Sequence, residues 1–237
     1  MAASDFLLTG HRGAPTRFPE NTVRSILGAI ACGATAVEVD VRVTCDDVLV
    51  LSHDPTLERI ANKPVDISQV NLEELQEIAF KGERIATLSE VAKAVKGVAS
   101  LDLDVKIPDR EAEIVQEISA HGDIRRTLFT SFSPEVVSKF KLVSSELRTG
   151  LIEQAAFRDA IEAAMQVGAS CILPEVSDLD GESLEMAQNA GLAVVPWTVD
   201  DPKVALDLLR RNVDGLITDD PCRLAGAVLD WRNSSGQ

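Results

Sequence analysis

The sequence predicts an α/β protein that forms one closed (β/α)8 barrel. Short apolar runs alternate with longer helical patterns along the 237 residues, and this strand–helix unit occurs eight times. Such alternation is typical of a parallel sheet with helices outside it, and eight units in a chain of this length favour a closed barrel. An open doubly wound sheet often carries a glycine-rich phosphate loop, which the sequence lacks. Polar residues follow the predicted strands, as expected at a barrel mouth.

The predicted strands are short apolar runs, and the second is β-branched with an alternating pattern, as strands require. In chain order they cover residues 6–9, 36–43, 101–107, 128–131, 148–152, 171–173, 193–198 and 215–218, with a short extra strand at 48–51.

The predicted helices lie between these strands. Asn21 is the expected N-cap of the first helix, and Gly33 lies just past its end. Residues 54–87 are the one long irregular stretch and are interpreted as a short insertion with a helix at 72–78. No linker rich in Gly, Ser or Pro divides the chain, so residues 1–237 are predicted to form a single domain. The helices cover 22–31, 88–95, 110–119, 134–143, 157–167, 181–189, 202–211 and 221–231.

The charge balance limits the partners that the protein can have. There are 23 basic and 38 acidic residues, a net charge of −15, which argues against a surface for nucleic acid or anionic membranes. No apolar run approaches the roughly 20 residues of a membrane span, so no stable membrane insertion is expected. A small-molecule substrate is expected instead. If it is a phosphate, a local cation and arginine must overcome the long-range repulsion.

The cysteines and the N-terminus bear on location. Cys32, Cys45, Cys171 and Cys222 form no Cys-x-x-Cys pair and have no zinc-site spacing to a histidine. They are predicted to be small reduced core residues. The N-terminus lacks the charged and apolar regions of a signal peptide, so a cytoplasmic location is expected.

Carboxylates on two neighbouring strands predict a metal site. Glu38 and Asp40 lie two residues apart in one strand, so their side chains share a face, where they repel unless a cation lies between them. Asp104 and Lys106 repeat this spacing on the next strand, and Asp104 is the predicted third ligand. Oxygen-only ligands suit one divalent cation, Mg²⁺ or Ca²⁺, better than Zn²⁺. The alternative is a salt-bridge ladder to Lys or Arg.

Two histidines flank these carboxylates. His11 follows the first strand and His53 follows the extra strand, which makes them candidates for the general base and general acid. Arg12 is suited to grip phosphate oxygens. The remaining predicted site residues are Lys106, facing an anionic substrate; Glu20 and Asn21, supporting Arg12 or His11 from behind; and Trp197, an apolar wall for the substrate or simple packing at the mouth.

Several short motifs occur in order along nearly the whole chain: His11-Arg12-Gly13, Pro19-Glu20-Asn21-Thr22, Glu38 with Asp40, Thr44, His53-Asp54, Asp104 with Lys106, Ser131-Phe132, Trp197-Thr198-Val199 and residues 214–219. This ordered set resembles the glycerophosphodiester phosphodiesterases. The resemblance implies a TIM barrel that hydrolyses glycerophosphodiesters to sn-glycerol 3-phosphate and an alcohol. It implies that His11 and His53 are the general base and acid, that Glu38, Asp40 and Asp104 bind the metal, and that Arg12 and Lys106 contact the phosphate.

Two positions depart from the pattern of this family. Asp104 stands where the family usually has Glu, so the metal must lie closer to its strand or be bound through water. Asp200 replaces a common Asn. Three alternatives stay open at this point: a phospholipase D-type activity on lysophospholipids, resembling that of spider-venom toxins; a non-catalytic barrel that binds a phosphorylated ligand; and a sugar-phosphate isomerase or aldolase that uses Lys106.

Overall fold

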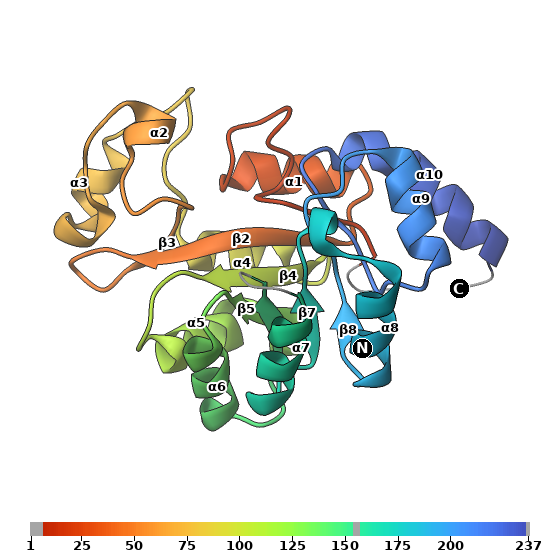
Figure 1. The fold of residues 1–237 in the computed structure, drawn as a ribbon. Helices are drawn as coiled ribbons and strands as arrows, with labels where there is room; N and C mark the ends of the chain where they lie inside the picture. Colours follow the sequence, from red (N-terminus) through yellow and green to blue (C-terminus); the bar gives the residue numbers. More distant parts are fainter. Residues whose placement is uncertain (1–6, 154–156, 236–237) are drawn as a thin grey trace.

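The computed structural model describes residues 7–153 and 157–235, and these form a barrel of parallel strands covered by helices (Figure 1). Neighbouring strands follow the order β8-β7-β6-β5-β4-β2-β1-β9, and β3 lies antiparallel to β2 outside this path. The predicted (β/α)8 barrel fold is therefore confirmed. The strands are β1 Thr9–Gly10, β2 Ala36–Val43, β3 Leu49–Leu51, β4 Ser100–Val105, β5 Thr127–Ser131, β6 Arg148–Ile152, β7 Cys171–Leu173, β8 Ala193–Val194 and β9 Ile217–Thr218.

The barrel closes where its first and last strands meet. β1 pairs in parallel with β9, and backbone hydrogen bonds join the β8 and β9 segments without a regular ladder. Two of these run from Ile217 N to Pro196 O at 3.0 Å and from Val199 N to Ile217 O at 2.8 Å. Pro196, which faces β9, and Pro174, which faces β8, both lack an N–H, which explains why the predicted strand 193–198 is regular only over Ala193–Val194.

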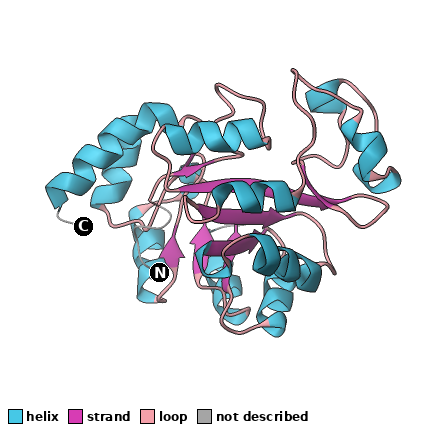
Figure 2. Cartoon of the chain, turned by 180° about the vertical axis from the view of Figure 1, so that it is seen from behind, coloured by secondary structure: helices cyan, strands magenta, loops and turns pink. Residues whose placement is uncertain are grey.

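The helices surround the sheet on its outer face (Figure 2). They are α1 Val23–Ala31, α4 Leu88–Val95, α5 Glu111–His121, α6 Pro134–Val143, α7 Phe157–Gln166, α8 Gly181–Asn189, α9 Pro202–Arg210 and α10 Pro221–Ser235.

The N-cap predicted for the first helix is wrong by one residue. Thr22 caps α1, because its side-chain oxygen accepts a hydrogen bond from Ser25 N at 3.1 Å. Asn21 has a positive φ of 56°, and its amide turns toward Asp40 instead. The chain therefore uses Thr22 for the helix and leaves Asn21 free for the barrel mouth.

The insertion has more structure than the single helix predicted at 72–78. It contains α2 Glu58–Ala61, the 3-10 helix Ile67–Gln69 and α3 Leu72–Gln76, which lie beyond one end of β2 and β3 (Figure 1). Its apolar side chains pack on β3 in one buried cluster, made up of Val50 of β3 with Leu57, Ile67, Leu75, Phe80 and Ile85. The insertion is thus a small packed unit set against the barrel.

Strand alternation sets which side chains fill the barrel. The apolar interior layer is formed by Ala36, Leu128, Ile152, Cys171, Leu173, Val195 and Ile217. Glu38 and Asp40 continue the inward-facing series from Ala36 on β2 and are buried. On β4, Asp102 and Asp104 lie in register with them, Glu38 opposite Asp102 and Asp40 opposite Asp104. These four buried carboxylates form an acidic layer, which lies next to the apolar layer on the side of the strands' C-terminal ends.

The prediction that all four cysteines are reduced is wrong for two of them. Cys32, which follows α1, and Cys222, in the first turn of α10, form a disulfide across a sequence separation of 190 residues. Cys45 and Cys171 are free. The cytoplasmic location stays a prediction, and the disulfide weighs against it because such bonds are rare in the cytosol.

In the described part of the chain, every helix is too short or too polar to cross a membrane.

Replacing Cys222 with Ser should lower the free energy of unfolding by about 2–5 kcal/mol, because the bond restricts a long loop in the unfolded chain. Denaturant titration without reductant measures the change, and Cys45→Ser is the matched control because Cys45 is free and exposed. Peptide mapping of the unreduced protein should recover Cys32 and Cys222 in one linked fragment. Alkylation of both thiols in the native protein would contradict the pairing.

Candidate active site

The predicted site residues meet at the mouth of the barrel, at the C-terminal ends of its strands. One pocket there is lined by His11, Arg12, Glu38, His53, Asp102, Asp104, Lys106, Phe132, Ile152, Leu173, Trp197 and Ile217. Asp40 does not line the pocket itself but contacts two residues that do, Arg12 and Lys106. Glu20 and Asn21 lie behind it, in contact with Arg12 and Asp40 respectively.

A sharp turn after β1 presents His11 and Arg12 to the pocket. Arg12 has a φ of 55°, and its N–H donates to Glu38 Oε2 at 2.8 Å. Gly13 has a φ of 89°, and a Cβ there would lie 2.5 Å from the backbone carbon of Ser25. Only glycine fits this close approach to α1. The turn is thus held by β2 on one side and by α1 on the other.

Each of the two histidines is oriented by an aspartate. His11 Nδ1 lies 2.7 Å from Asp219 Oδ1, and His53 Nδ1 lies 2.7 Å from Asp54 Oδ1. Burial raises the pKa values of Asp219 and Asp54, but the histidines together with Arg12 beside Asp219 and Arg59 beside Asp54 outweigh it, so both pKa values are lowered. An ionised carboxylate only accepts, so Nδ1 of each imidazole is the donor. Nε2 is therefore the nitrogen of each ring left for the pocket.

The acidic layer brings three carboxylates close together. One oxygen each from Glu38, Asp40 and Asp104 lies within 4.8 Å of the others. Burial, followed by repulsion from Asp40, Asp104 and Asp102, raises the pKa of Glu38 well above its ordinary value. Burial also raises the pKa of Asp104 to about 6. The cluster holds more negative charge than its surroundings balance.

Two cations offset part of this charge. Lys106 Nζ lies 3.1 Å from Asp40 Oδ1 and also bonds Asp104, and Arg12 Nε lies 3.1 Å from Asp40 Oδ2. Burial alone would raise the pKa of Asp40, but Lys106 and Arg12 outweigh it and the pKa is lowered. The salt-bridge ladder considered for these strands is therefore present around Asp40. It leaves Asp104 Oδ1 buried without a hydrogen-bond partner.

The same contacts argue against a lysine nucleophile. Burial would lower the pKa of Lys106, but Asp104 and Asp40 raise it above its ordinary value. Schiff-base chemistry needs a depressed lysine pKa, so an aldolase-type role does not fit Lys106.

Asn21 and Glu20 hold the carboxylates and Arg12 from behind. The Asn21 amide donates to Asp40 Oδ2 at 2.8 Å, and its oxygen accepts from Asp40 N at 3.1 Å. Glu20 Oε1 accepts from Arg12 Nη1 at 3.1 Å. These hydrogen bonds fix the orientation of the Asp40 and Arg12 side chains, in addition to the ion pair between them.

Aromatic rings form the far side of the pocket. Trp197 and Phe132 pack edge to face with centroids 5.9 Å apart, and Trp197 Nε1 donates to Leu173 O at 2.9 Å. Lys106 Nζ lies 4.9 Å from the Phe132 ring centroid. Trp197 therefore packs at the barrel mouth and also faces the pocket.

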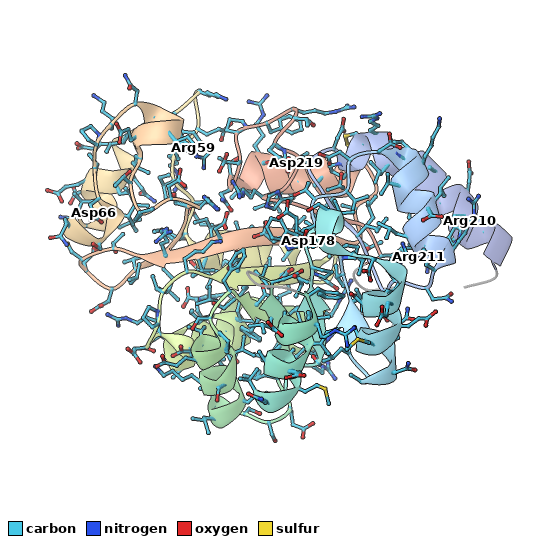
Figure 3. The ribbon with its side chains drawn as sticks, viewed as in Figure 1. Arg59, Asp66, Asp178, Arg210, Arg211 and Asp219 are labelled. Carbon is cyan, nitrogen blue, oxygen red and sulfur yellow. A yellow bond between two sulfur atoms is a disulfide. The ribbon has the colours of Figure 1, made fainter. Side chains whose placement is uncertain are left out.

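Sequence reasoning gave no role to three residues that contact the site residues: Asp54, Asp219 and Arg59. Asp219 and Arg59 are labelled in Figure 3. Asp54 directly follows His53. Asp219 could have been found from barrel closure, because the last strand ends beside the first. It is held there by Asp200 Oδ1, which accepts from Asp219 N at 2.9 Å and Thr218 Oγ1 at 2.8 Å. An Asn oxygen could accept the same bonds, which explains why Asp200 is tolerated.

Comparisons with known proteins agree with this geometry. The sequence model of the Glycerophosphoryl diester phosphodiesterase family matches residues 11–223. The chain is 29% identical over 236 residues to a glycerophosphodiester phosphodiesterase of Caldanaerobacter subterraneus subsp. tengcongensis, covering 94% of this chain and 97% of that one.

Solved structures give the same result. A phosphodiesterase of Oleispira antarctica in complex with the product sn-glycerol-3-phosphate matches with a TM-score of 0.86 and 25% identity, covering 94% of this chain and 96% of that one. A glycerophosphodiester phosphodiesterase of Agrobacterium tumefaciens matches with a TM-score of 0.83 and 26% identity, covering 93% and 99%. The chain belongs to the glycerophosphoryl diester phosphodiesterase family.

Proposed function

We propose that this enzyme hydrolyses glycerophosphodiesters to sn-glycerol 3-phosphate and an alcohol, with His11 and His53 as its acid–base pair. Family membership supports glycerophosphodiester hydrolysis, and the Oleispira antarctica relative was solved with sn-glycerol-3-phosphate. The observation that carries the proposal is the pair of His–Asp contacts, each 2.7 Å, on one pocket that also holds the carboxylate cluster.

The orientation of the two rings supports their proposed roles. Because Nδ1 of each ring donates to an aspartate, Nε2 of a neutral ring carries the lone pair and can take a proton. One histidine removes a proton from the nucleophile, which is either water or the adjacent hydroxyl of the substrate. The other, in its protonated form, gives a proton to the departing alkoxide. Asp54 and Asp219 stabilise whichever ring is positively charged.

The residues at the mouth fit one divalent cation, Mg²⁺ or Ca²⁺. Three carboxylate oxygens within 4.8 Å of one another can all reach one Ca²⁺, whose ligands lie about 2.3–2.6 Å away. Asp104 Oδ1 is buried and unpartnered, which suits a ligand atom even though Asp is shorter than the usual Glu. Glu38, Asp40 and Asp104 would hold the ion. When bound, it would supply positive charge that stabilises the phosphodiester oxygens in the transition state.

Arg12, Lys106 and Trp197 are the proposed substrate contacts. The Arg12 and Lys106 side chains are 17% and 12% exposed, so their charges reach the pocket with little screening by water. They would contact the phosphate oxygens, Arg12 with its planar fork and Lys106 as a point charge. The Trp197 and Phe132 rings would pack against the organic part of the substrate.

His11→Ala and His53→Ala should each reduce turnover of glycerophosphocholine by about 10²–10⁴-fold, the usual contribution of general acid–base catalysis. Release of sn-glycerol 3-phosphate, read with a coupled dehydrogenase, measures the loss. His121→Ala is the matched control, because this third histidine lies in α5 and contacts Glu117 away from the pocket. Near-normal turnover by either folded variant would refute the assignment, and a wild-type protein that binds but does not hydrolyse would favour a non-catalytic barrel.

The cation-free protein should lose stability as pH rises from about 4 to about 7. Burial raises the pKa of Asp102 to about 7 and that of Asp104 to about 6, from an ordinary 3.8. The folded state therefore retains protons that the unfolded state releases, and each group lowers the free energy of unfolding by up to about 1.4 kcal/mol per pH unit in that window. Carboxylates with lowered pKa values, such as Asp219, make the free energy of unfolding increase with pH, but only below about pH 4.

Denaturant titration in the presence of a chelator, from pH 5 to pH 8, measures this slope. Asp102→Asn should reduce it, because Asp102 contributes a proton in this range and bonds only Thr130 among the described side chains. A free energy of unfolding that increases over the same range would contradict the account.

A further inference from the structure

We propose that Arg59, in the insertion, is a positioning residue that fixes His53 and Arg12 relative to each other. The proposal rests on the proposed function, because it assigns Arg59 to the same reaction. Arg59 does not line the pocket, and it acts through two carboxylates, Asp54 and Glu20, that do not line it either.

One side of the Arg59 guanidinium holds the partner of His53. Arg59 Nε donates to Asp54 Oδ2, and the other oxygen of Asp54 accepts from His53 Nδ1 at 2.7 Å. Asp54 therefore binds the insertion with one oxygen and the imidazole with the other. Because both oxygens are used, the carboxylate cannot rotate without breaking a charged hydrogen bond.

The other side of the guanidinium holds the partner of Arg12. Arg59 Nη1 and Nη2 donate to Glu20 Oε2 and Oε1, each at 2.7 Å, which is a bidentate pair. Glu20 Oε1 also accepts from Arg12 Nη1 at 3.1 Å. Arg12 Nε in turn lies 3.1 Å from Asp40 Oδ2. A continuous chain of charged contacts thus runs from His53 through Arg59 to the carboxylate cluster.

This chain joins three separate segments of the fold. Arg59 lies in α2, on the side of the insertion that faces α1 in Figure 3; Asp54 follows β3; and Glu20 precedes α1. The insertion shares its apolar cluster with Val50 of β3, and backbone hydrogen bonds from Cys45 N to Val70 O and from Leu51 N to Ala86 O also hold it against the sheet. What Arg59 adds to these contacts is a charged link between the segment that carries His53 and the segment that supports Arg12.

The geometry requires arginine. Its planar fork places three nitrogens in fixed directions, one toward Asp54 and two toward Glu20, whereas a lysine has a single nitrogen and cannot reproduce the bidentate pair. Glu20 and Asp54 are 18% and 27% exposed, so these bonds are partly shielded from water. The pKa values of both carboxyls are lowered, against the effect of burial, by their bonds with Arg59 and its neighbours.

Arg59→Gln and Arg59→Lys test the proposal, with kcat and KM measured for glycerophosphocholine in excess Mg²⁺ or Ca²⁺. Because a misplacement of about 1 Å can cost about 100-fold, we expect both variants to lose about 10- to 100-fold in kcat. The change in KM should be smaller. The pH profile of Arg59→Gln should also differ from that of the wild type, because Asp54 then has fewer cations beside it.

Arg24→Gln is the matched control. Arg24 also links α1 to the insertion, through Glu83 Oε1 at 3.3 Å, but neither residue contacts the histidines or the carboxylate cluster. This variant should retain wild-type kcat and pH profile. If it loses as much activity as the Arg59 variants, docking of the insertion in general is responsible, and the specific role of Arg59 is refuted.

Other outcomes separate this proposal from the proposed function. An active wild type whose folded Arg59→Lys variant has unchanged kcat, KM and pH profile would overturn the role of Arg59 and leave the hydrolase intact. Should Arg59→Gln fail to fold, Arg59→Lys keeps the charge and decides the matter alone. A wild type that hydrolyses no glycerophosphodiester, even with its histidine–aspartate contacts verified by imidazole NMR, would refute the proposed function instead.

Discussion

The burial of like charges at the barrel mouth is the constraint on which the rest of the site depends. Parallel pairing of β2 and β4 puts Glu38 opposite Asp102 and Asp40 opposite Asp104, with all four side chains buried. Lys106 and Arg12 neutralise Asp40 and part of Asp104, and Glu38 is left with a raised pKa. Such a cluster costs stability unless a further positive charge is added, and that need explains why the site is suited to a cation.

Barrel closure and the segment that leads into the insertion each bring one histidine to the pocket that holds this cluster. β9 pairs with β1, so Asp219 reaches His11, while the segment after β3 carries His53 together with its aspartate. The two rings are held by different parts of the fold: His11 by Asp219 after β9, and His53 by Asp54 at the start of the insertion. The Arg59 contacts connect these parts, which links the geometry of an apparently peripheral segment to the chemistry at the centre.

Features that depend on local pattern were predictable from the sequence. The alternation of strands and helices predicted the barrel, and the two-residue spacing of Glu38 with Asp40 predicted which side chains share a face. Features that depend on tertiary closure were not. The Cys32–Cys222 bond joins residues 190 apart, and it forms because the end of α1 meets the start of α10 once the barrel closes. Arg59 belongs to the irregular insertion, where no hydrophobic periodicity indicates which way a side chain points. The choice of Thr22 over Asn21 as N-cap follows from the need of Asp40 for an amide partner.

Calorimetric titration of the chelated protein with Mg²⁺ or Ca²⁺ at pH 6, repeated in buffers of different ionisation enthalpy, tests the central claim most directly. The account predicts one bound cation and a net release of protons, because Asp104 has a pKa of about 6 and Glu38 a pKa above its ordinary value, and both must be ionised to serve as ligands. Glu38→Gln should abolish the binding. A wild-type protein that binds no cation, or binds one without releasing protons, would contradict the account.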